Sequence, residues 1–266
     1  SLKLIKVNRQ TLKLFAAQSQ EELAQNLHDV FRGDMLTRML PEMLSLWNGQ
    51  LDYSKQTVTY ALDGPRIEAQ IHVRVLQGHE DEWDRVLISL EDVTETVVAR
   101  QQLAASERYA RNLFDYSPVS LWVEDFSGVK ALLDEARSQG IQDFRVFLSV
   151  HPEFVSRCMQ EIRVLNVNRQ TLQMFGAASQ EELLAHLNQV FRDEVHDTFA
   201  EQLIDLWNGK TEQTREVVNY HLGGALINIH MQFAVLPDHA DDWGLVLVSL
   251  VDITARKKAE AYLEYL

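Results

Sequence analysis

The stretch KVNRQTLKLFAAQSQEEL, residues 6–23, returns almost unchanged as NVNRQTLQMFGAASQEEL at residues 166–183. Pairing each residue with the one 160 positions later needs no gap over residues 2–96, and about 37 of these 95 pairs are identical. A repeat of this length is too long for a solenoid unit and is typical of a duplicated domain. Because no gap is needed, every turn keeps its length, and we expect the two copies to share one backbone.

Length, charge and cysteine content limit the kind of protein. A chain of 266 residues can form two domains that each bury a core. The formal net charge of -14 argues against nucleic-acid partners and anionic membrane surfaces, which both need Lys and Arg. No apolar run is long enough to span a bilayer, and no signal peptide is recognisable. With Cys158 as the single cysteine, we expect a cytoplasmic protein.

The text between the copies, residues 97–161, has no repeat partner. VVARQQLAASERYARNLF (97–114) lacks Gly and Pro and predicts a helix that ends before Ser117-Pro118. VSLWVED (119–125) alternates and predicts a strand, and two helix-like stretches follow it. The second copy therefore has a front end that the first copy lacks. We expect the missing part upstream of Ser1 in a longer parent, because a sheet without its first strand exposes an edge.

The second copy reads as an α+β domain. EIRVLNVN predicts a strand, RQTLQMFGA a short helix that ends at Gly176, and Ser179 with Glu182 a capping box for the next helix. A longer helix is expected over residues 193–207. TREVVNYHL, ALINIHMQFAVL and WGLVLVSLVDIT predict three consecutive strands with one buried face and one wetter face.

This order of elements resembles the PAS sensor-domain family. The resemblance rests on Asp92-Val93-Thr94 and Asp252-Ile253-Thr254 at the end of each copy, on the Asn-x5-Leu/Met-Phe opening, and on Leu-Trp-Asn-Gly. It implies two PAS-like domains, each a five-stranded antiparallel sheet with helices packed on one face, the first without its opening strand. The expected boundaries are domain 1 over 1–96, a helical signalling linker over 97–117, domain 2 over 118–254, and the start of an output-coupling helix over 255–266.

The resemblance also implies a ligand site between the inner sheet face and the long helix. In copy two its candidate lining consists of large, mostly apolar side chains: Phe199, Leu203, Trp207, Val218, Tyr220, Ile229, Met231 and Phe233. Pockets for small molecules have this character. The alternative is a filled core, and the bulk of these side chains favours it.

Two cofactor readings are weak. His196 lies near the position where haem-binding members of the family carry their axial ligand, but copy one has Leu36 there, and a lone helical histidine is more often a surface or capping residue. Flavin-adduct photosensors of the family carry cysteine in Asn-Cys-Arg-Phe, whereas Cys158 lies in SRCMQ. A structural thiol is the better interpretation. We expect no metal site.

The helices that follow each Asp-x-Thr carry small and apolar residues at coiled-coil spacing. The predicted seam consists of Ala99, Leu103, Ala110 and Leu113, joined by Ser106 and, after copy two, by Ala259, Leu263 and Leu266. Because the seam is short, it suits a helix that changes partner or pitch. A homodimer is the expected assembly, and the apolar outer sheet face of copy two, Leu245, Leu247 and Val251, is a second contact candidate.

Catalytic signatures are absent from the sequence: there is no Walker loop, Gly-x-Ser-x-Gly or His-Glu-x-x-His. We therefore expect a non-catalytic tandem sensor and dimerisation module of a bacterial signalling protein, with Asp92, Thr94, Asp252 and Thr254 as the signal-coupling residues. ARKKAEAYLEYL looks like the stretch that leads into diguanylate cyclase domains. A histidine-kinase sensor and a ligand-free dimerisation scaffold are the alternatives, and an enzyme in its own right is a third.

Overall fold

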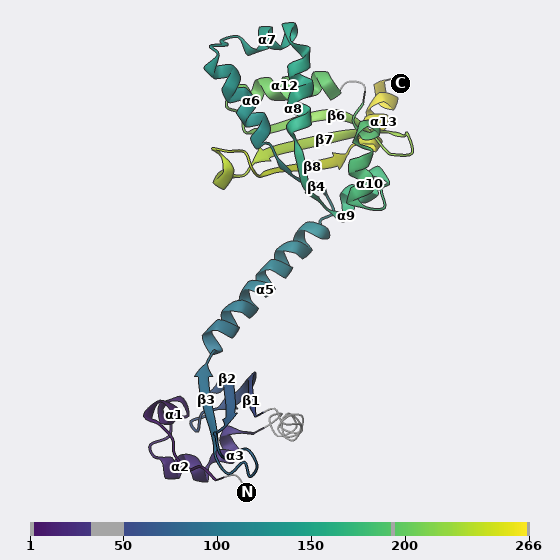
Figure 1. Cartoon of the computed structure of the whole chain (residues 1–266). Helices are drawn as coiled ribbons and strands as arrows, with labels where there is room; N and C mark the ends of the chain where they lie inside the picture. The colour runs from purple at the N-terminus through teal and green to yellow at the C-terminus, as the bar shows by residue number, and fades with distance from the viewer. Residues whose placement is uncertain (1–2, 33–50, 193–194, 265–266) are drawn as a thin grey trace. The chain divides into compact units, whose positions relative to one another are not determined.

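The computed structural model describes residues 3–32, 51–192 and 195–264 of the chain (Figure 1). It forms two compact units, Ser1–Glu107 and Arg108–Leu266, called domain 1 and domain 2 here. The division falls inside α5 (Thr94–Asp115), the helix predicted between the copies. None of the described helices is long and apolar enough to cross a membrane.

Domain 2 contains the five-stranded antiparallel sheet that the sequence predicts. Its order is β5-β4-β8-β7-β6, so the strand from the unrepeated front, β4, lies between β5 and β8. The bounds are β4 Ser120–Asp125, β5 Arg163–Val167, β6 Glu212–Tyr220, β7 Leu226–Val235 and β8 Val246–Asp252. The alternation predicted for β7 is confirmed: Ile229 and Phe233 are buried, whereas Gln232, directly before Phe233, is exposed.

The helices of domain 2 follow local signals in the sequence. α9 ends where Gly176 adopts the left-handed conformation, and Ser179 accepts a hydrogen bond from the backbone N–H of Glu182 to start α10. α7 was not predicted. The bounds are α6 Ser127–Ser138, α7 Phe144–Val150, α8 Pro152–Glu161, α9 Arg169–Phe175, α10 Gln180–Ala185, α11 Leu187–Val190, α12 Val195–Trp207, the 3₁₀ turn η1 Pro237–His239 and α13 Thr254–Glu264.

Domain 1 has a smaller sheet than expected. Its described elements are α1 Arg9–Leu14, α2 Gln20–Gln25, α3 Leu27–Val30, β1 Asp52–Tyr60, β2 Arg66–Val75 and β3 Val86–Asp92, and the sheet order is β1-β2-β3. Without its opening strand the repeat should still contain the counterpart of β5, but residues 3–7 form no strand. The reason is pairing: in domain 2, β5 pairs with β4 alone, and the described part of domain 1 holds no β4.

The inner face of domain 1 is correspondingly open. Val86 and Ile88 are 40% and 51% exposed, whereas Val246 and Val248, their repeat partners in domain 2, are 0% and 7% exposed. In domain 2, β4 pairs along β8 and Trp122 lies opposite Val248. The difference follows from the missing strand, since no described residue of domain 1 pairs with the second edge of β3. The two copies therefore have similar sequences, but among the described residues a further strand shields this part of the sheet only in domain 2.

Candidate functional site

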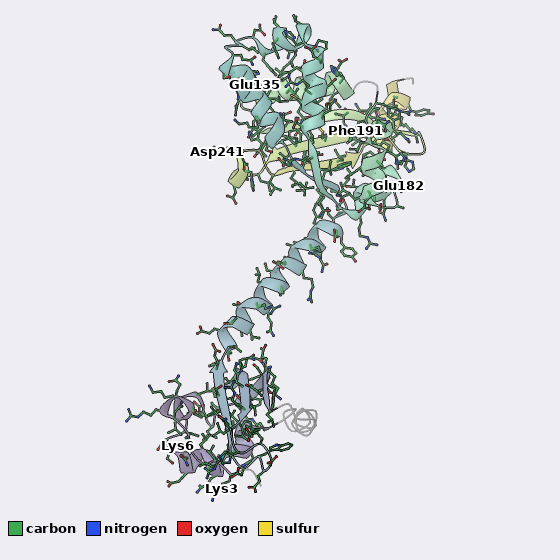
Figure 2. The ribbon with its side chains drawn as sticks, viewed as in Figure 1. Lys3, Lys6, Glu135, Glu182, Phe191 and Asp241 are labelled. Atoms are coloured by element: carbon green, nitrogen blue, oxygen red, sulfur yellow. The ribbon has the colours of Figure 1, made fainter. Side chains whose placement is uncertain are left out.

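Domain 2 has a cavity of about 410 Å³, partly open to solvent, between the inner face of its sheet and helices α8, α11 and α12. Fourteen of its nineteen wall residues are apolar; the polar ones are Glu124, Asn188, Thr198, Gln202 and Asn219. Phe191, labelled in Figure 2, is part of the wall and packs against Trp122 at 5.9 Å between ring centroids. The cavity argues against a filled core in this domain. The volume and the apolar wall with few polar groups are those of a small-molecule pocket.

The predicted lining residues divide into two groups of equal size. Phe199, Val218, Met231 and Phe233 lie in the cavity wall. Leu203 and Ile229, both fully buried, belong to the packed core instead. Trp207 stacks on Phe144 of α7 at 4.3 Å, and Arg192 lies over Tyr220 at 3.7 Å from the ring centroid. Trp207 and Tyr220 do not reach the cavity, because their rings pack against Phe144 and Arg192 instead.

The placement of Tyr220 on the inner face of β6 was wrong. Val217 lies directly across from Ile229 and Asn219 across from Ile227, and both partners point to the inner face. Residues opposite each other in an antiparallel pair share a face, so the odd-numbered residues of β6 face inward. Tyr220 therefore lies on the outer side, paired with the exposed Leu226. Val217 and Val218 are adjacent in the sequence, so the alternation of apolar and polar residues does not show which of the two faces inward.

Glu124 is the cavity residue that the sequence reading missed. It follows Ser120 and Trp122 at a spacing of two on β4 and lies opposite the buried Val246, so it shares their inner face. Burial raises the pKa of its carboxyl from 4.5 to about 7. No described residue gives this carboxyl a hydrogen bond or an ion pair. The alternation of VSLWVED was the available signal, because it places this acid on the same side as Trp122.

A second unpartnered polar group belongs to the same wall. The indole N–H of Trp122 is buried and has no hydrogen-bond partner among the described residues. Buried donors and acceptors are normally paired, and an unpaired one calls for an explanation. The cavity wall thus combines a carboxyl and an N–H group that the described protein leaves unpaired.

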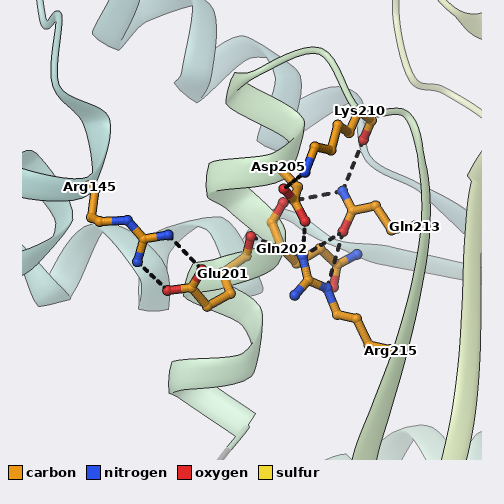
Figure 3. Close-up of polar contacts among 7 residues, drawn as sticks. All are labelled: Arg145, Glu201, Gln202, Asp205, Lys210, Gln213 and Arg215. Atoms are coloured by element: carbon orange, nitrogen blue, oxygen red, sulfur yellow. Dashed lines mark hydrogen bonds and ion pairs between the residues drawn. The ribbon is translucent and has the colours of Figure 1, made fainter.

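A polar network fixes α12 over the cavity (Figure 3). Arg145 of α7 pairs with Glu201 on one side of the helix, at 2.8 Å between Nη2 and Oε2. On the other side, Arg215 of β6 pairs with Asp205, and Gln213 Nε2 donates to the backbone carbonyl of Gln202 at 3.3 Å. Gln202 itself is part of the wall, so this network positions a cavity residue.

The two cofactor candidates lie outside the cavity wall. His196 Nε2 is 3.1 Å from the carbonyl oxygen of Pro152, at the start of α8. Cys158 is fully buried on α8, and burial raises the pKa of its thiol to about 12, so it is an inert core thiol at neutral pH. Within residues 3–32, 51–192 and 195–264, no cluster of His, Cys, Asp and Glu could hold a metal ion.

The Asp-x-Thr junctions have the same geometry in both domains. Asp252 Oδ1 accepts from the N–H of Thr254 at 2.8 Å, and Thr254 Oγ1 accepts from the N–H of Asn228 on β7 at 2.9 Å. Asp92 and Thr94 repeat these bonds, with Glu68 of β2 as the donor to the threonine hydroxyl. The aspartate thus caps the helix, whereas the threonine hydroxyl ties the helix to the neighbouring strand.

The second junction carries an additional clamp. Glu216 on β6 pairs with Arg256, and with Lys257 at 2.6 Å, both in the first turn of α13. The residues 160 positions earlier are Gln56, Thr96 and Val97, none of which is charged. The ion pairs lower the pKa of Glu216, mainly through the hydrogen bond from Lys257. The helix that leaves domain 2 is therefore held to the sheet more extensively than α5 is.

The predicted seam is exposed wherever the structure describes it. α5 has no buried residue over its 22 positions, and Leu103 and Leu113 are 62% and 59% exposed. Ala99, Ala110 and Ala259 are also exposed, and Leu263 on α13 is 70% exposed. Leu266 lies outside the described residues.

The chain matches the model of one protein family in two regions. A model of the PAS domain matches residues 1–95 and 153–255, the two copies of the repeat. The chain belongs to the PAS domain family, and its two copies are PAS sensory domains of the kind found in signalling proteins. None of the curated proteins searched is significantly similar to it.

Solved structures with similarity to the chain include a PAS domain and a LOV domain. A domain of a sensory box sensor histidine kinase/response regulator from Geobacter sulfurreducens is 16% identical, with 56% of this chain and 96% of that chain covered and a TM-score of 0.35. The PAS domain of an HTR-like protein from Haloarcula marismortui is 14% identical, with coverages of 58% and 98% and a TM-score of 0.36. The LOV domain of a blue-light activated histidine kinase from Erythrobacter litoralis is 18% identical, with coverages of 51% and 96% and a TM-score of 0.34.

Proposed function

We propose that domain 2 binds a small molecule in its cavity and passes the occupancy signal through Asp252 and Thr254 to α13. The observation that carries this proposal is the 410 Å³ apolar cavity in domain 2. β8 forms part of the cavity wall through Val248 and Leu250, and the same strand ends at Asp252. A ligand that spreads the wall therefore acts on the strand that positions the junction.

The chain acts as a homodimer in this proposal. The apolar seam residues of α5 and α13 are exposed at coiled-coil spacing, and a second copy of the same helices would cover them symmetrically. On the sequence alone, ARKKAEAYLEYL favours a diguanylate cyclase as the output domain, with a histidine kinase as the alternative. The rival function is a ligand-free dimerisation scaffold, and the cavity argues against it.

Native mass spectrometry of the purified chain, compared with its denatured mass, tests whether the cavity is occupied. We expect extra mass on the wild type and on Ile88→Phe, the matched variant in domain 1. Val248→Phe, which places a phenyl ring in the cavity wall, should abolish the extra mass. Wild-type chain without bound mass would favour the scaffold, and extra mass retained by Val248→Phe would place the ligand elsewhere.

A further inference from the structure

The chemistry of the cavity wall indicates which ligand it takes, on the premise that the proposed small-molecule site is correct. Of the nineteen wall residues, Glu124 is the one that titrates. The wall contains no Lys, Arg or His. A carboxylate in an apolar cavity is costly unless a positive charge or hydrogen-bond donors compensate it.

The charged groups near Glu124 are already paired with other residues. Arg163 on the neighbouring strand pairs with Asp125 at 3.0 Å, and Asp125 also accepts a hydrogen bond from the N–H of Ser127. Asp242 acts on Asp125 and is held by His239 and the N–H of Gly244. Across β8, Glu124 faces Val246. Burial is the one cause that raises its pKa, so no cation of the described protein offsets its charge.

We infer that the domain 2 cavity selects a small amphipathic cation, an apolar molecule with one primary amine or amidine group, and that Glu124 is the residue that binds this group. The apolar body would contact the aromatic part of the wall, which includes Trp122, Phe199 and Phe233. The side-chain amides of Asn188, Gln202 and Asn219 supply further acceptors for the remaining N–H groups.

Above about pH 7, where the carboxyl is ionised, a neutral ligand would leave its charge uncompensated. An anionic ligand would meet like charge there and is disfavoured for that reason. A bound cation lowers the pKa of Glu124. Near pH 7, chains in which Glu124 is protonated therefore release this proton when the cation binds. Affinity for the cation should therefore fall as the pH drops below about 7, where the carboxyl becomes neutral.

The test compares three isosteric probes, 4-phenylbutylamine, 4-phenylbutan-1-ol and 4-phenylbutyrate, by isothermal titration calorimetry on the full chain at pH 8. We expect the amine to bind at least about tenfold more tightly than the alcohol, and the acid most weakly. Glu124→Gln should reduce the amine-to-alcohol ratio to about one and leave alcohol binding intact. Glu161→Gln, which removes an exposed carboxylate outside the wall, should keep the wild-type ratio.

The wild type itself provides a test that needs no variant. At pH 6 the amine should lose its advantage over the alcohol, and at pH 7 the heat of amine binding should change with the ionisation enthalpy of the buffer. An unchanged ratio in Glu124→Gln, or an amine that binds no better than the alcohol, overturns the inference while the site itself stands. If none of the three probes binds, the proposed small-molecule site fails, and the inference fails with it.

Discussion

At the scale of single residues, Glu124 shows how one partly buried acid links pH to stability. Below pH 4.5 its carboxyl is neutral in both the folded and the unfolded chain. As the pH rises towards about 7, the unfolded chain ionises first, because the folded pKa is the higher one, and domain 2 is destabilised. Well above pH 7 the loss reaches its full size of roughly 3 kcal/mol.

Glu124→Gln should therefore raise the free energy of unfolding of domain 2 at pH 8, by up to roughly 3 kcal/mol, and change it little at pH 4.5. Urea denaturation followed by tryptophan fluorescence measures this difference. The control Glu161→Gln should show no such pH dependence. A variant that destabilises domain 2 equally at both pH values would contradict the buried-acid interpretation.

The duplicated asparagine is a second test at this scale. Asn168 is fully buried, and its side-chain oxygen accepts from the N–H groups of Leu121 and Thr171. Its side-chain nitrogen donates to the carbonyls of Phe114 and Val119. Asn8, its repeat partner, is exposed, and among the described residues its side chain accepts hydrogen bonds from Thr11 alone and has no counterpart of β4 beside it.

Asn168→Ala should cost about 3 kcal/mol of unfolding free energy, because it leaves several buried backbone groups unpaired. Asn8→Ala should cost about 1 kcal/mol, the loss of one helix cap. Thermal unfolding of the two variants, followed by calorimetry, compares them within one chain. Equal losses would show that the identical sequence has the same role in both domains.

At the scale of elements, the junction makes a similar paired prediction. Thr254→Val removes the hydroxyl that accepts from the N–H of Asn228 and should lower the free energy of unfolding of domain 2 by about 1 kcal/mol. Glu216→Gln removes the clamp on Arg256 and Lys257 and should speed amide exchange in the first turn of α13. If exchange there stays unchanged, the ion pairs do not hold the helix.

The elements also show what the sequence could and could not predict. Helix ends at Gly176 and Ser179 were predictable, since their signals are local. The inward face of β6 was not, because Val217 and Val218 are adjacent and only pairing with β7 decides between them. Whether residues 3–7 form a strand depends on pairing with a counterpart of β4, which lies far away in the sequence. No local sequence pattern could predict this.

At the scale of the whole molecule, the exposed seam predicts association. Leu103→Glu on α5 should convert a dimer to a monomer in sedimentation velocity runs, because it puts like charges in the seam of both chains. Ala105→Glu, an exposed change two residues away and off the seam, should leave the dimer intact. A wild-type chain that sediments as a monomer at high micromolar concentration would contradict the homodimer.

The duplication was readable from the sequence, but the functional difference between the copies was not. The repeat gives two related sheets, whereas the cavity depends also on β4 and α8, which come from the unrepeated segment. Cavity volume also escapes sequence reasoning, because the same bulky side chains that could fill a core can line one. Trp207 and Tyr220 illustrate this: their rings pack on Phe144 and under Arg192 and leave the cavity free.

Hydrogen exchange of the full chain, with and without 4-phenylbutylamine, most directly tests whether occupancy of domain 2 reaches its junction. The account predicts slower exchange at residues 226–230 and 252–258, no change at the matching residues 66–70 and 92–98 of domain 1, and no change anywhere in Val248→Phe. Protection confined to the cavity wall, or equal protection at both junctions, would contradict a signal that leaves domain 2 through Asp252 and Thr254.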